Sequence, residues 1–246
     1  MAVTQQMNFI SKRVGNAIAD YDMMQDGDKI MVAVSGGKDS LSLLQVMQYR
    51  QSFIPVGLEI VAVHVDAGMP DFPMEQMIGY FKEWGVAYHI EKADLLKGKT
   101  WETIDCYQCS RERRKVLFEL ADKMGCNKIA LGHHMDDIVE TILLNMFYRG
   151  EIGSMCPKQE LFDGKLAIIR PLAYIKEEDV EALAHEGDFL DISPFKCPND
   201  ETSKRRAMKD LLAQLEKENS AVKKNIIHSL ENIKYDYLLE KKGVSL

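Results

Sequence analysis

The chain has 246 residues, of which 46% are hydrophobic and 28% charged, and its formal net charge is −7. This is the composition of an ordinary soluble globular protein, near the upper size limit of one α/β domain. Neither a membrane-spanning apolar run nor a basic N-terminal patch followed by an apolar core is present, which excludes a membrane span and a secretory signal and favours the cytoplasm.

The predicted elements alternate between helix and strand along most of the chain. Apolar residues at helical spacing, beginning with Met7, Ile10 and Val14, predict an amphipathic helix over residues 4–21. Short β-rich runs predict strands at 29–34, 60–65, 86–90, 127–131 and 166–169. Helical stretches lie between them at 40–49, 74–84 and 107–124, with a longer one ending near 149. The alternation indicates a doubly wound, mainly five-stranded parallel sheet that binds ligands at the carboxyl ends of its strands.

Strands are not expected after about residue 175. Two further helices are predicted there, over 202–218 and 221–241. The chain is therefore expected to comprise an N-terminal helix (1–25), a central α/β domain (26–200) and a C-terminal helical extension (201–246).

The loop after the first predicted strand carries the strongest motif, Ser35-Gly36-Gly37-Lys38-Asp39-Ser40. Its glycines let backbone amides approach phosphate oxygens, and the next helix points its N-terminus at the same anion. The two serines can donate hydroxyl hydrogen bonds, and Lys38 adds a positive charge. The nucleoside-triphosphatase loop has Ser or Thr directly after its Lys, so Asp39 argues against kinase or GTPase chemistry.

Polar residues also end the second and fourth predicted strands. His64 ends the second, and Gly132-His133-His134-Met135-Asp136-Asp137 follows the fourth. Consecutive acids at the start of a helix often serve as simple caps. Capping and a catalytic role are both open for Asp136 and Asp137 at this point.

Two cysteines begin the helix predicted at 107–124. Cys106, Cys109 and Arg113 share one helical stripe with Leu117, the stripe that turns inward. Thiols at a helix N-terminus beside several Arg and Lys residues are expected to ionise. A Cys-x-x-Cys pair is either a redox pair or half a metal site, and a thioredoxin-like context for the redox reading is absent.

The other cysteines differ in setting. Cys126 leads into a buried strand and is expected to be a core thiol, whereas Cys156 has no clear assignment and Cys197 lies in a loop between two prolines.

Two segments near the cysteines are rich in basic residues: residues 92–115 carry seven Lys or Arg against four Asp or Glu, and 202–217 carry five against two. Since phosphate binding needs a basic face and not a basic protein, a nucleic-acid partner is compatible with the net charge.

The loop at 35–40 resembles the PP-loop of ATP-dependent adenylating enzymes, which have the adenine nucleotide alpha hydrolase-like fold. Together with Cys106-Tyr107-Gln108-Cys109, the run from Gly132 to Asp137 and the lone Cys197, it resembles the tRNA 2-thiocytidine synthetase family over roughly residues 8–200. The resemblance implies that ATP is cleaved to AMP and pyrophosphate. AMP would activate the C2 oxygen of a tRNA pyrimidine, with cytidine 32 expected, and sulfur would replace that oxygen.

The resemblance also implies roles for individual residues. The loop residues 35–40, with His64 and Gly132, would bind ATP. Asp39, Asp136 and Asp137 would serve Mg²⁺ binding and catalysis, with Asp137 favoured. Three thiolates, from Cys106, Cys109 and Cys197, would hold a [4Fe-4S] cluster whose open iron carries a sulfide, and Arg113 would face both cluster and substrate.

The resemblance implies three partners: tRNA, a sulfur donor such as a cysteine desulfurase or free sulfide, and a second copy of the chain in a homodimer.

Three alternatives to a cluster-dependent tRNA sulfurtransferase stay open. One is another PP-loop reaction without a cluster, such as lysidine synthesis or amide formation. A second is a zinc site at the cysteines, with Cys156 as a possible fourth ligand. The third is a nucleotide-binding sensor, which the acids Asp39, Asp136 and Asp137 disfavour.

Overall fold

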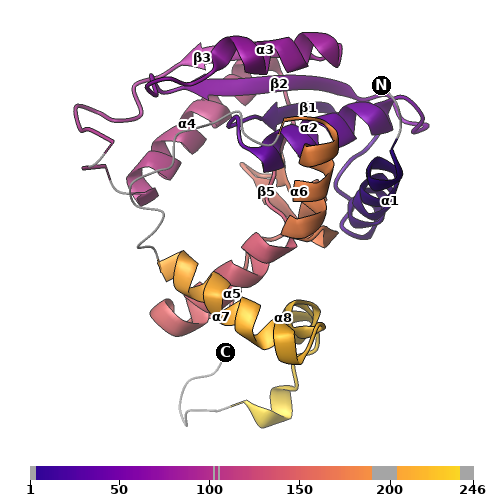
Figure 1. Cartoon of the computed structure of the whole chain (residues 1–246), viewed down its shortest axis with the longest axis vertical. Helices are drawn as coiled ribbons and strands as arrows, with labels where there is room; N and C mark the ends of the chain where they lie inside the picture. Colours follow the sequence, from indigo (N-terminus) through magenta and orange to yellow (C-terminus); the bar gives the residue numbers. More distant parts are fainter. Residues whose placement is uncertain (1–3, 102, 105, 190–203, 239–246) are drawn as a thin grey trace. The chain divides into compact units, whose positions relative to one another are not determined.

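A computed structural model describes residues 4–101, 103–104, 106–189 and 204–238, apart from the side chain of Cys106 (Figure 1). The described strands form one six-stranded sheet in the order β3-β2-β1-β4-β6-β5. They are β1 (Lys29–Ala33), β2 (Glu59–Asp66), β3 (Ala87–Lys92), β4 (Lys128–Ala130), β5 (Lys158–Leu161) and β6 (Leu166–Ile169). All neighbours pair in parallel except β5, which is antiparallel to β6. The expected five parallel strands are confirmed, and an unexpected edge strand adds to them.

The helices mostly follow the predicted ranges. They are α1 (Gln5–Asp20), α2 (Lys38–Gln51), α3 (Met74–Glu83), α4 (Cys106–Met124), α5 (Met135–Arg149), α6 (Glu177–Glu186), α7 (Lys204–Glu218) and α8 (Val222–Glu231), with 3-10 turns η1 (Pro171–Tyr174) and η2 (Tyr235–Tyr237). Helix α6 was not predicted. The helix predicted over 221–241 is wrong for residues 232–238, because Asn232 ends α8 and donates its side-chain amide to the carbonyl of His228 at 2.8 Å; residues 239–241 lie outside the described part.

Two apolar clusters cover the two faces of the sheet. Successive residues of β1 alternate between them: Ile30 and Val32 pack in the cluster that contains α1, α2, α3 and α6, and Met31 packs in the one that contains α4. This is the two-residue period of a strand with both faces buried. Cys126 belongs to the second cluster, so its predicted role as a core thiol is confirmed.

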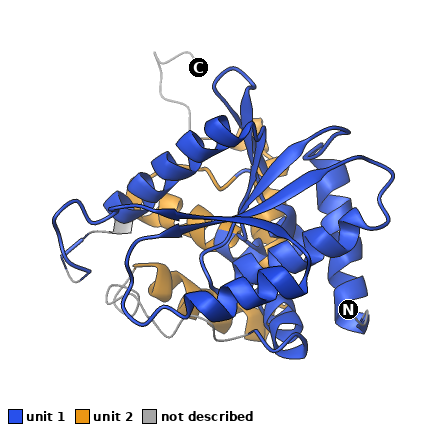
Figure 2. Cartoon of the chain, turned by 90° about the horizontal axis from the view of Figure 1, so that it is seen from above, with its two compact units in different colours: residues 1–137, 156–203 blue, residues 138–155, 204–246 orange. Residues whose placement is uncertain are grey.

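The chain divides into two compact units (Figure 2). The first, residues 1–137 with 156–203, contains the sheet and helices α1 to α4 and α6. The second, residues 138–155 with 204–246, contains most of α5 together with α7 and α8. None of the described helices is long and apolar enough to cross a membrane.

The sheet changes its direction of growth between β1 and β4. Strand β2 lies on one side of β1 and β4 on the other, so the loops that follow β1 and β4 diverge from one point, where ligands bind in such sheets. These loops are in close contact. A Cβ added to Gly132 would lie 2.9 Å from the backbone carbonyl of Asp39 and from the amide nitrogen of Ser40.

Gly132→Ala should therefore lower the free energy of unfolding by about 1–3 kcal/mol, because the two backbones must separate to admit the methyl group. Gly79→Ala is the matched control. Gly79 lies exposed inside α3 with no atom within 4 Å of its added Cβ, and this substitution should stabilise by about 0.5–1 kcal/mol. Urea unfolding of both variants measures the difference. Equal stabilities for the two would contradict the close approach.

Candidate functional site

The loop between β1 and α2 is held by the hydroxyls of its own serines. The Ser40 hydroxyl accepts from the backbone N–H of Ser35 at 3.1 Å and donates to the carbonyl of Gly37 at 2.9 Å. The hydroxyl of Ser35 accepts from the N–H of Gly37 at 3.3 Å. Gly37 is the N-cap residue of α2 and has no side chain to cap the helix. Because no side chain caps the N-terminus of α2, its first backbone N–H groups are available to bind an anion at this loop.

An aromatic side chain lies against the same loop. Gly36 has a positive φ of 91°, and a Cβ there would lie 2.6 Å from the ring of Phe72. Phe72 in turn stacks on His64, with ring centroids 4.8 Å apart. Only glycine satisfies both the left-handed backbone and the ring contact at this position.

His64 is buried in β2 beneath that stack. Its Nδ1 lies 2.8 Å from the carbonyl oxygen of Val34, so Nδ1 carries the proton and donates. Burial lowers the pKa of His64 below its usual value, and the positive charge of Arg113 adds to the effect against the opposing Val34 carbonyl and Asp66. A neutral imidazole follows, with Nε2 as a hydrogen-bond acceptor at the end of β2.

Lys38 is surrounded by carboxylates. Its Nζ lies 3.0 Å from Asp39, 3.3 Å from Glu177 and 3.7 Å from Glu181, the last two on α6. Burial alone lowers the pKa of Lys38, but the charges and hydrogen bonds of Asp39 and Glu177 outweigh it, and the net shift is upward. The lysine is therefore a fully charged ammonium, held by acids that a phosphate group would have to replace.

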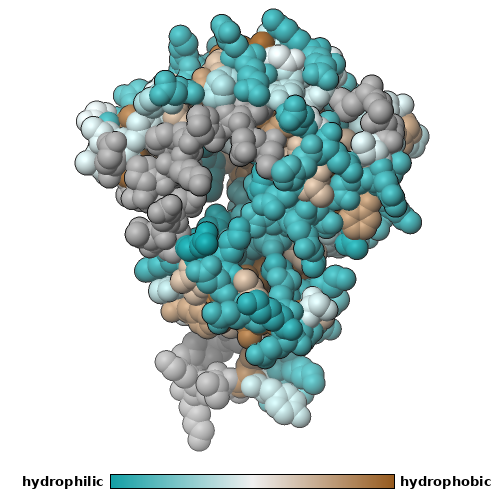
Figure 3. Space-filling model, viewed as in Figure 1, coloured by the Kyte–Doolittle hydropathy of each residue, from teal (hydrophilic) through white to brown (hydrophobic). Residues whose placement is uncertain are grey.

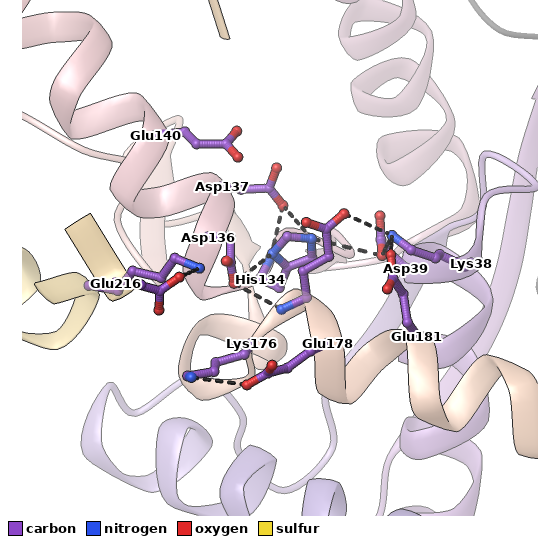
Figure 4. Close-up of polar contacts among 12 residues, drawn as sticks. Lys38, Asp39, His134, Asp136, Asp137, Glu140, Lys176, Glu178, Glu181 and Glu216 are labelled. Carbon is purple, nitrogen blue, oxygen red and sulfur yellow. Dashed lines mark hydrogen bonds and ion pairs between the residues drawn. The ribbon is translucent and has the colours of Figure 1, made fainter. Parts of the chain in front are cut away.

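The loop after β4 brings a second set of polar side chains to this point (Figure 4). His134 is buried, and its Nε2 lies 3.8 Å from Oδ1 of Asp39 and 3.5 Å from Oδ2 of Asp137. One imidazole nitrogen thus lies between a carboxylate of the first loop and a carboxylate of the second. The predicted residues Asp39, Gly132 and Asp137 are brought together here.

The two acids at the start of α5, Asp136 and Asp137, accept hydrogen bonds from different parts of the chain. Asp137 accepts from the backbone N–H of His134 at 3.0 Å, the acidic half of a capping box, and its side chain stays 19% exposed. Asp136 is buried and accepts from the backbone N–H of Glu177 at 2.8 Å, so it caps α6. Asp136 therefore fixes the helix that presents Glu177 to Lys38, and Asp137 is the more accessible carboxylate.

Arg170 contacts the loop that follows β4. It is buried, donates through Nη1 to the carbonyl of Cys156, and lies with Nε 3.4 Å from Nδ1 of His133. Burial lowers the pKa of Arg170; Cys156 and Asp137 oppose this, and the charge of Arg114 acts in the same direction as burial.

The predicted metal ligands are only partly described. Cys109 lies in the first turn of α4 as a partly exposed thiol, Cys106 begins the helix with its side chain outside the described part, and Cys197 lies outside it entirely. Within the described ranges, no three His, Cys, Asp or Glu side chains are placed to hold a metal ion. One turn after Cys109, the Nε of Arg113 is buried and has no hydrogen-bond partner among the described residues.

Sequence reasoning missed several residues that the structure adds to the site. Glu177 and Glu181 come from the unpredicted α6, and Phe72 from the loop before α3. A signal for α6 was available: three acids at 177–179 precede Val180, Leu183 and Ala184 at helical spacing. Phe72 had no comparable local signal.

Comparison with known proteins gives consistent matches. A family model described as a PP-loop domain matches residues 6–191. The tRNA-cytidine(32) 2-sulfurtransferase of Geobacter sulfurreducens is 42% identical over 237 residues, covering 94% of this chain and 92% of its own length. The protein of that name from Pseudomonas putida strain W619 is 41% identical over 246 residues, covering 95% and 88%.

One solved structure has a closely similar fold. The U34-tRNA thiolase NcsA from Methanococcus maripaludis, solved with its [4Fe-4S] cluster, superposes with a TM-score of 0.76 at 24% identity, covering 93% of this chain and 80% of its own. At that identity the similarity establishes the fold alone.

Removing the charge of Glu177 should strengthen nucleotide binding. Glu177→Gln takes away one of the carboxylates that compete with phosphate for Lys38, and a partly buried charge at this distance corresponds to about 1 kcal/mol, or roughly fivefold in the Kd of ATP. Titration calorimetry with ATP and with pyrophosphate would measure it.

Glu178→Gln is the matched control, because Glu178 is exposed on the same helix and pairs with Lys176 at 2.9 Å instead. Its Kd values should equal those of the unmodified chain. Weaker ATP binding by Glu177→Gln would show that Glu177 contributes to the nucleotide site and does not compete with it.

Proposed function

We propose that this chain, which belongs to the PP-loop family of tRNA-cytidine(32) 2-sulfurtransferases, replaces the C2 oxygen of cytidine 32 in tRNA with sulfur. It is a tRNA-thiolating enzyme of the ATP-using PP-loop class. The observation that carries the finer proposal is the identity of 41–42% to the tRNA-cytidine(32) 2-sulfurtransferases, and the meeting of Asp39 with Asp137 at His134 supports it. A tRNA substrate would place the reaction in the cytoplasm.

The PP-loop would bind the phosphates of ATP. The backbone N–H groups at the start of α2 and the hydroxyls of Ser35 and Ser40 offer donors, and Lys38 offers its charge once it leaves Glu177 and Glu181. His64, at the end of the neighbouring strand with an acceptor Nε2, is suited to the adenosine half of the nucleotide. Gly132 contributes by its small size, which lets the second loop reach the phosphates.

Asp39 and Asp137 would hold Mg²⁺. Magnesium in phosphate-transfer sites is commonly bound by one or two carboxylates together with substrate phosphates and waters. These two carboxylates both lie near one imidazole nitrogen of His134, and both are more exposed than Asp136. Asp136 is buried and caps α6, so we assign it a positioning role.

The reaction has two steps. The C2 oxygen of cytidine bonds to the α-phosphorus of ATP, the bond to the β-phosphate oxygen breaks, and pyrophosphate leaves. A sulfide then bonds to C2, and AMP departs with the original oxygen. The positive charge of Lys38 favours the first step, because negative charge builds up on the departing pyrophosphate, and a Mg²⁺ held by Asp39 and Asp137 would add to that stabilisation.

Cys109, with Cys106 and Cys197, would hold a [4Fe-4S] cluster. Thiolates are the usual ligands of such clusters, and Cys109 lies partly exposed in the first turn of α4. The unpartnered Nε of Arg113, one turn along α4, is a donor available to a bound group or to the substrate. When bound, the cluster would supply the sulfur, replenished by a cysteine desulfurase or free sulfide. A homodimer is the proposed assembly.

The function is tested with the anaerobically purified chain, reconstituted with iron and sulfide and given ATP, Mg²⁺, sulfide and an unmodified tRNA transcript. We expect 2-thiocytidine at position 32 together with AMP, measured by mass spectrometry of the digested nucleosides. A thionucleoside at another position would correct the target base. No ATP-dependent thionucleoside would refute the proposal.

Cys106→Ala should abolish the visible absorption of the cluster and the thiolation of tRNA, while the Kd for ATP changes less than about twofold, because the PP-loop is built by other elements. Cys156→Ala is the control: Cys156 is an exposed thiol outside the proposed ligand set and should leave both signals intact. Thiolation by Cys106→Ala would exclude the cluster as the source of sulfur. Loss of bound metal in Cys156→Ala would favour the zinc site.

A further inference from the structure

The second unit carries an exposed surface where α5 ends and α7 begins. We name it the aromatic–basic patch and define it as Met146, Phe147, Tyr148, Arg149, Lys204 and Arg206. We propose that this patch binds unpaired nucleotides of the tRNA substrate. The proposal rests on the proposed function for the identity of the substrate, and on the geometry of the second unit for the place of contact.

The patch exposes large apolar side chains in consecutive positions. Phe147 is 56% exposed, Tyr148 48% and Met146 46%, and all three lie in the last turn of a helix that buries Ile142 and Leu143 one turn earlier. Tan and brown surface gathers where α5 ends in Figure 3. Side chains of this kind cost free energy in water unless a partner covers them.

The backbone that carries these side chains is fixed. Helix α5 ends at Arg149, and Gly150 follows in the left-handed conformation that terminates helices. The chain then turns back, with the amide of Asn145 donating to the carbonyl of Gly153 at 2.9 Å and Glu151 N–H donating to the Asn145 carbonyl at 3.2 Å. The aromatic side chains are therefore presented on an ordered support.

Cations accompany the rings. The ammonium of Lys204 lies 4.4 Å from the centroid of Tyr148, and Arg149 and Arg206 are exposed. The nearby acids are partly engaged: Asp210 pairs with Arg206 at 3.3 Å, and the buried Glu140 pairs with Arg205 at 2.7 Å, while Glu151 is exposed. With Arg206 paired to Asp210, Arg149 and Lys204 are the cations of the patch that a polyanion would meet.

Rings and cations on one ordered surface fit single-stranded RNA. Unpaired bases stack on aromatic side chains, and Arg or Lys contacts the adjoining phosphates. The target of the proposed reaction is a base that must be unpaired to be reached. A loop of tRNA supplies both the exposed base faces and the phosphates.

A second copy of the chain fits this patch less well. In a two-fold dimer formed through it, each patch would face its own copy, which brings the charges of Arg149 and Lys204 against the same two charges of the second copy. Like charges facing each other across an interface oppose association, whereas a polyanion is attracted. Charge therefore favours RNA as the occupant.

The test measures binding of the full chain to an unmodified tRNA transcript with cytidine at position 32, by fluorescence anisotropy over about 50–200 mM salt. Tyr148→Ala should raise the Kd by about 5- to 150-fold with an unchanged salt dependence, because it removes stacking and no charge. Arg149→Ala should reduce the slope of log Kd against log salt by about 0.7–0.9, the loss of one phosphate contact.

Controls separate binding from folding. Tyr148→Phe keeps the ring and should bind within about twofold of the unmodified chain, so a loss seen only in the alanine variant reports stacking. Phe53→Ala and Lys12→Ala remove an exposed aromatic and an exposed cation of the first unit and should leave both Kd and slope unchanged.

Each result decides the proposal. If the unmodified chain thiolates tRNA and the patch variants bind it normally, the patch proposal is wrong and the proposed function stands. If the variants convert a dimer to a monomer by light scattering with an unchanged Kd for tRNA, the patch is a protein interface. If the unmodified chain neither binds nor thiolates tRNA, both proposals fail.

Discussion

The close approach of two backbones at Gly132 is the constraint on which the rest of the site depends. With no side chain at that position, the loop after β4 lies against the carbonyl of Asp39 and the amide of Ser40. That contact sets where α5 begins, and therefore where His134 and Asp137 stand relative to the PP-loop. The parallel pairing of β1 with β4 brings the loops to the same edge of the sheet, but pairing alone leaves room for a side chain between them.

Around this contact, carboxylates outnumber the basic side chains that they surround. Lys38 lies among Asp39, Glu177 and Glu181, and His134 lies between Asp39 and Asp137. A triphosphate would add several negative charges to a place already rich in carboxylates. In the proposed function, such a ligand would be accommodated by exchange of carboxylate for phosphate at the lysine and by a divalent cation that neutralises the remaining acids. The acidic end of α6 would then be coupled to nucleotide binding, and Asp136 sets the position of that end by capping it.

Local sequence signals predicted the sheet and the PP-loop because both depend on short-range chemistry: apolar runs in β1 and β2, and glycines between a strand and a helix. They could not predict the link from Lys38 to Glu177, which spans 139 residues and depends on how α6 packs on α2. Strand β5 was missed because Lys158-Gln159-Glu160-Leu161 is a short polar run that only its pairing with β6 identifies as a strand. The apolar spacing continues through Ile233 and Tyr237, but the cap at Asn232 ends α8 before them.

One face of α4 carries both core residues and residues of the proposed cluster site. Leu117 and Leu120 are buried against the sheet, Arg113 is half-buried and close enough to His64 to lower its pKa, and Cys109 is partly exposed one turn earlier. The same helical face therefore emerges from the apolar core at the end of the sheet where β2 presents His64. Cys126, inside the core, shows the contrast: burial raises its pKa and keeps it a thiol. Cys109, at the other end of the stripe, is partly exposed, with Arg113 one turn along the helix. Exposure therefore separates the buried thiol of Cys126, which packs in the core, from the thiol of Cys109, which is the one proposed to bind a metal.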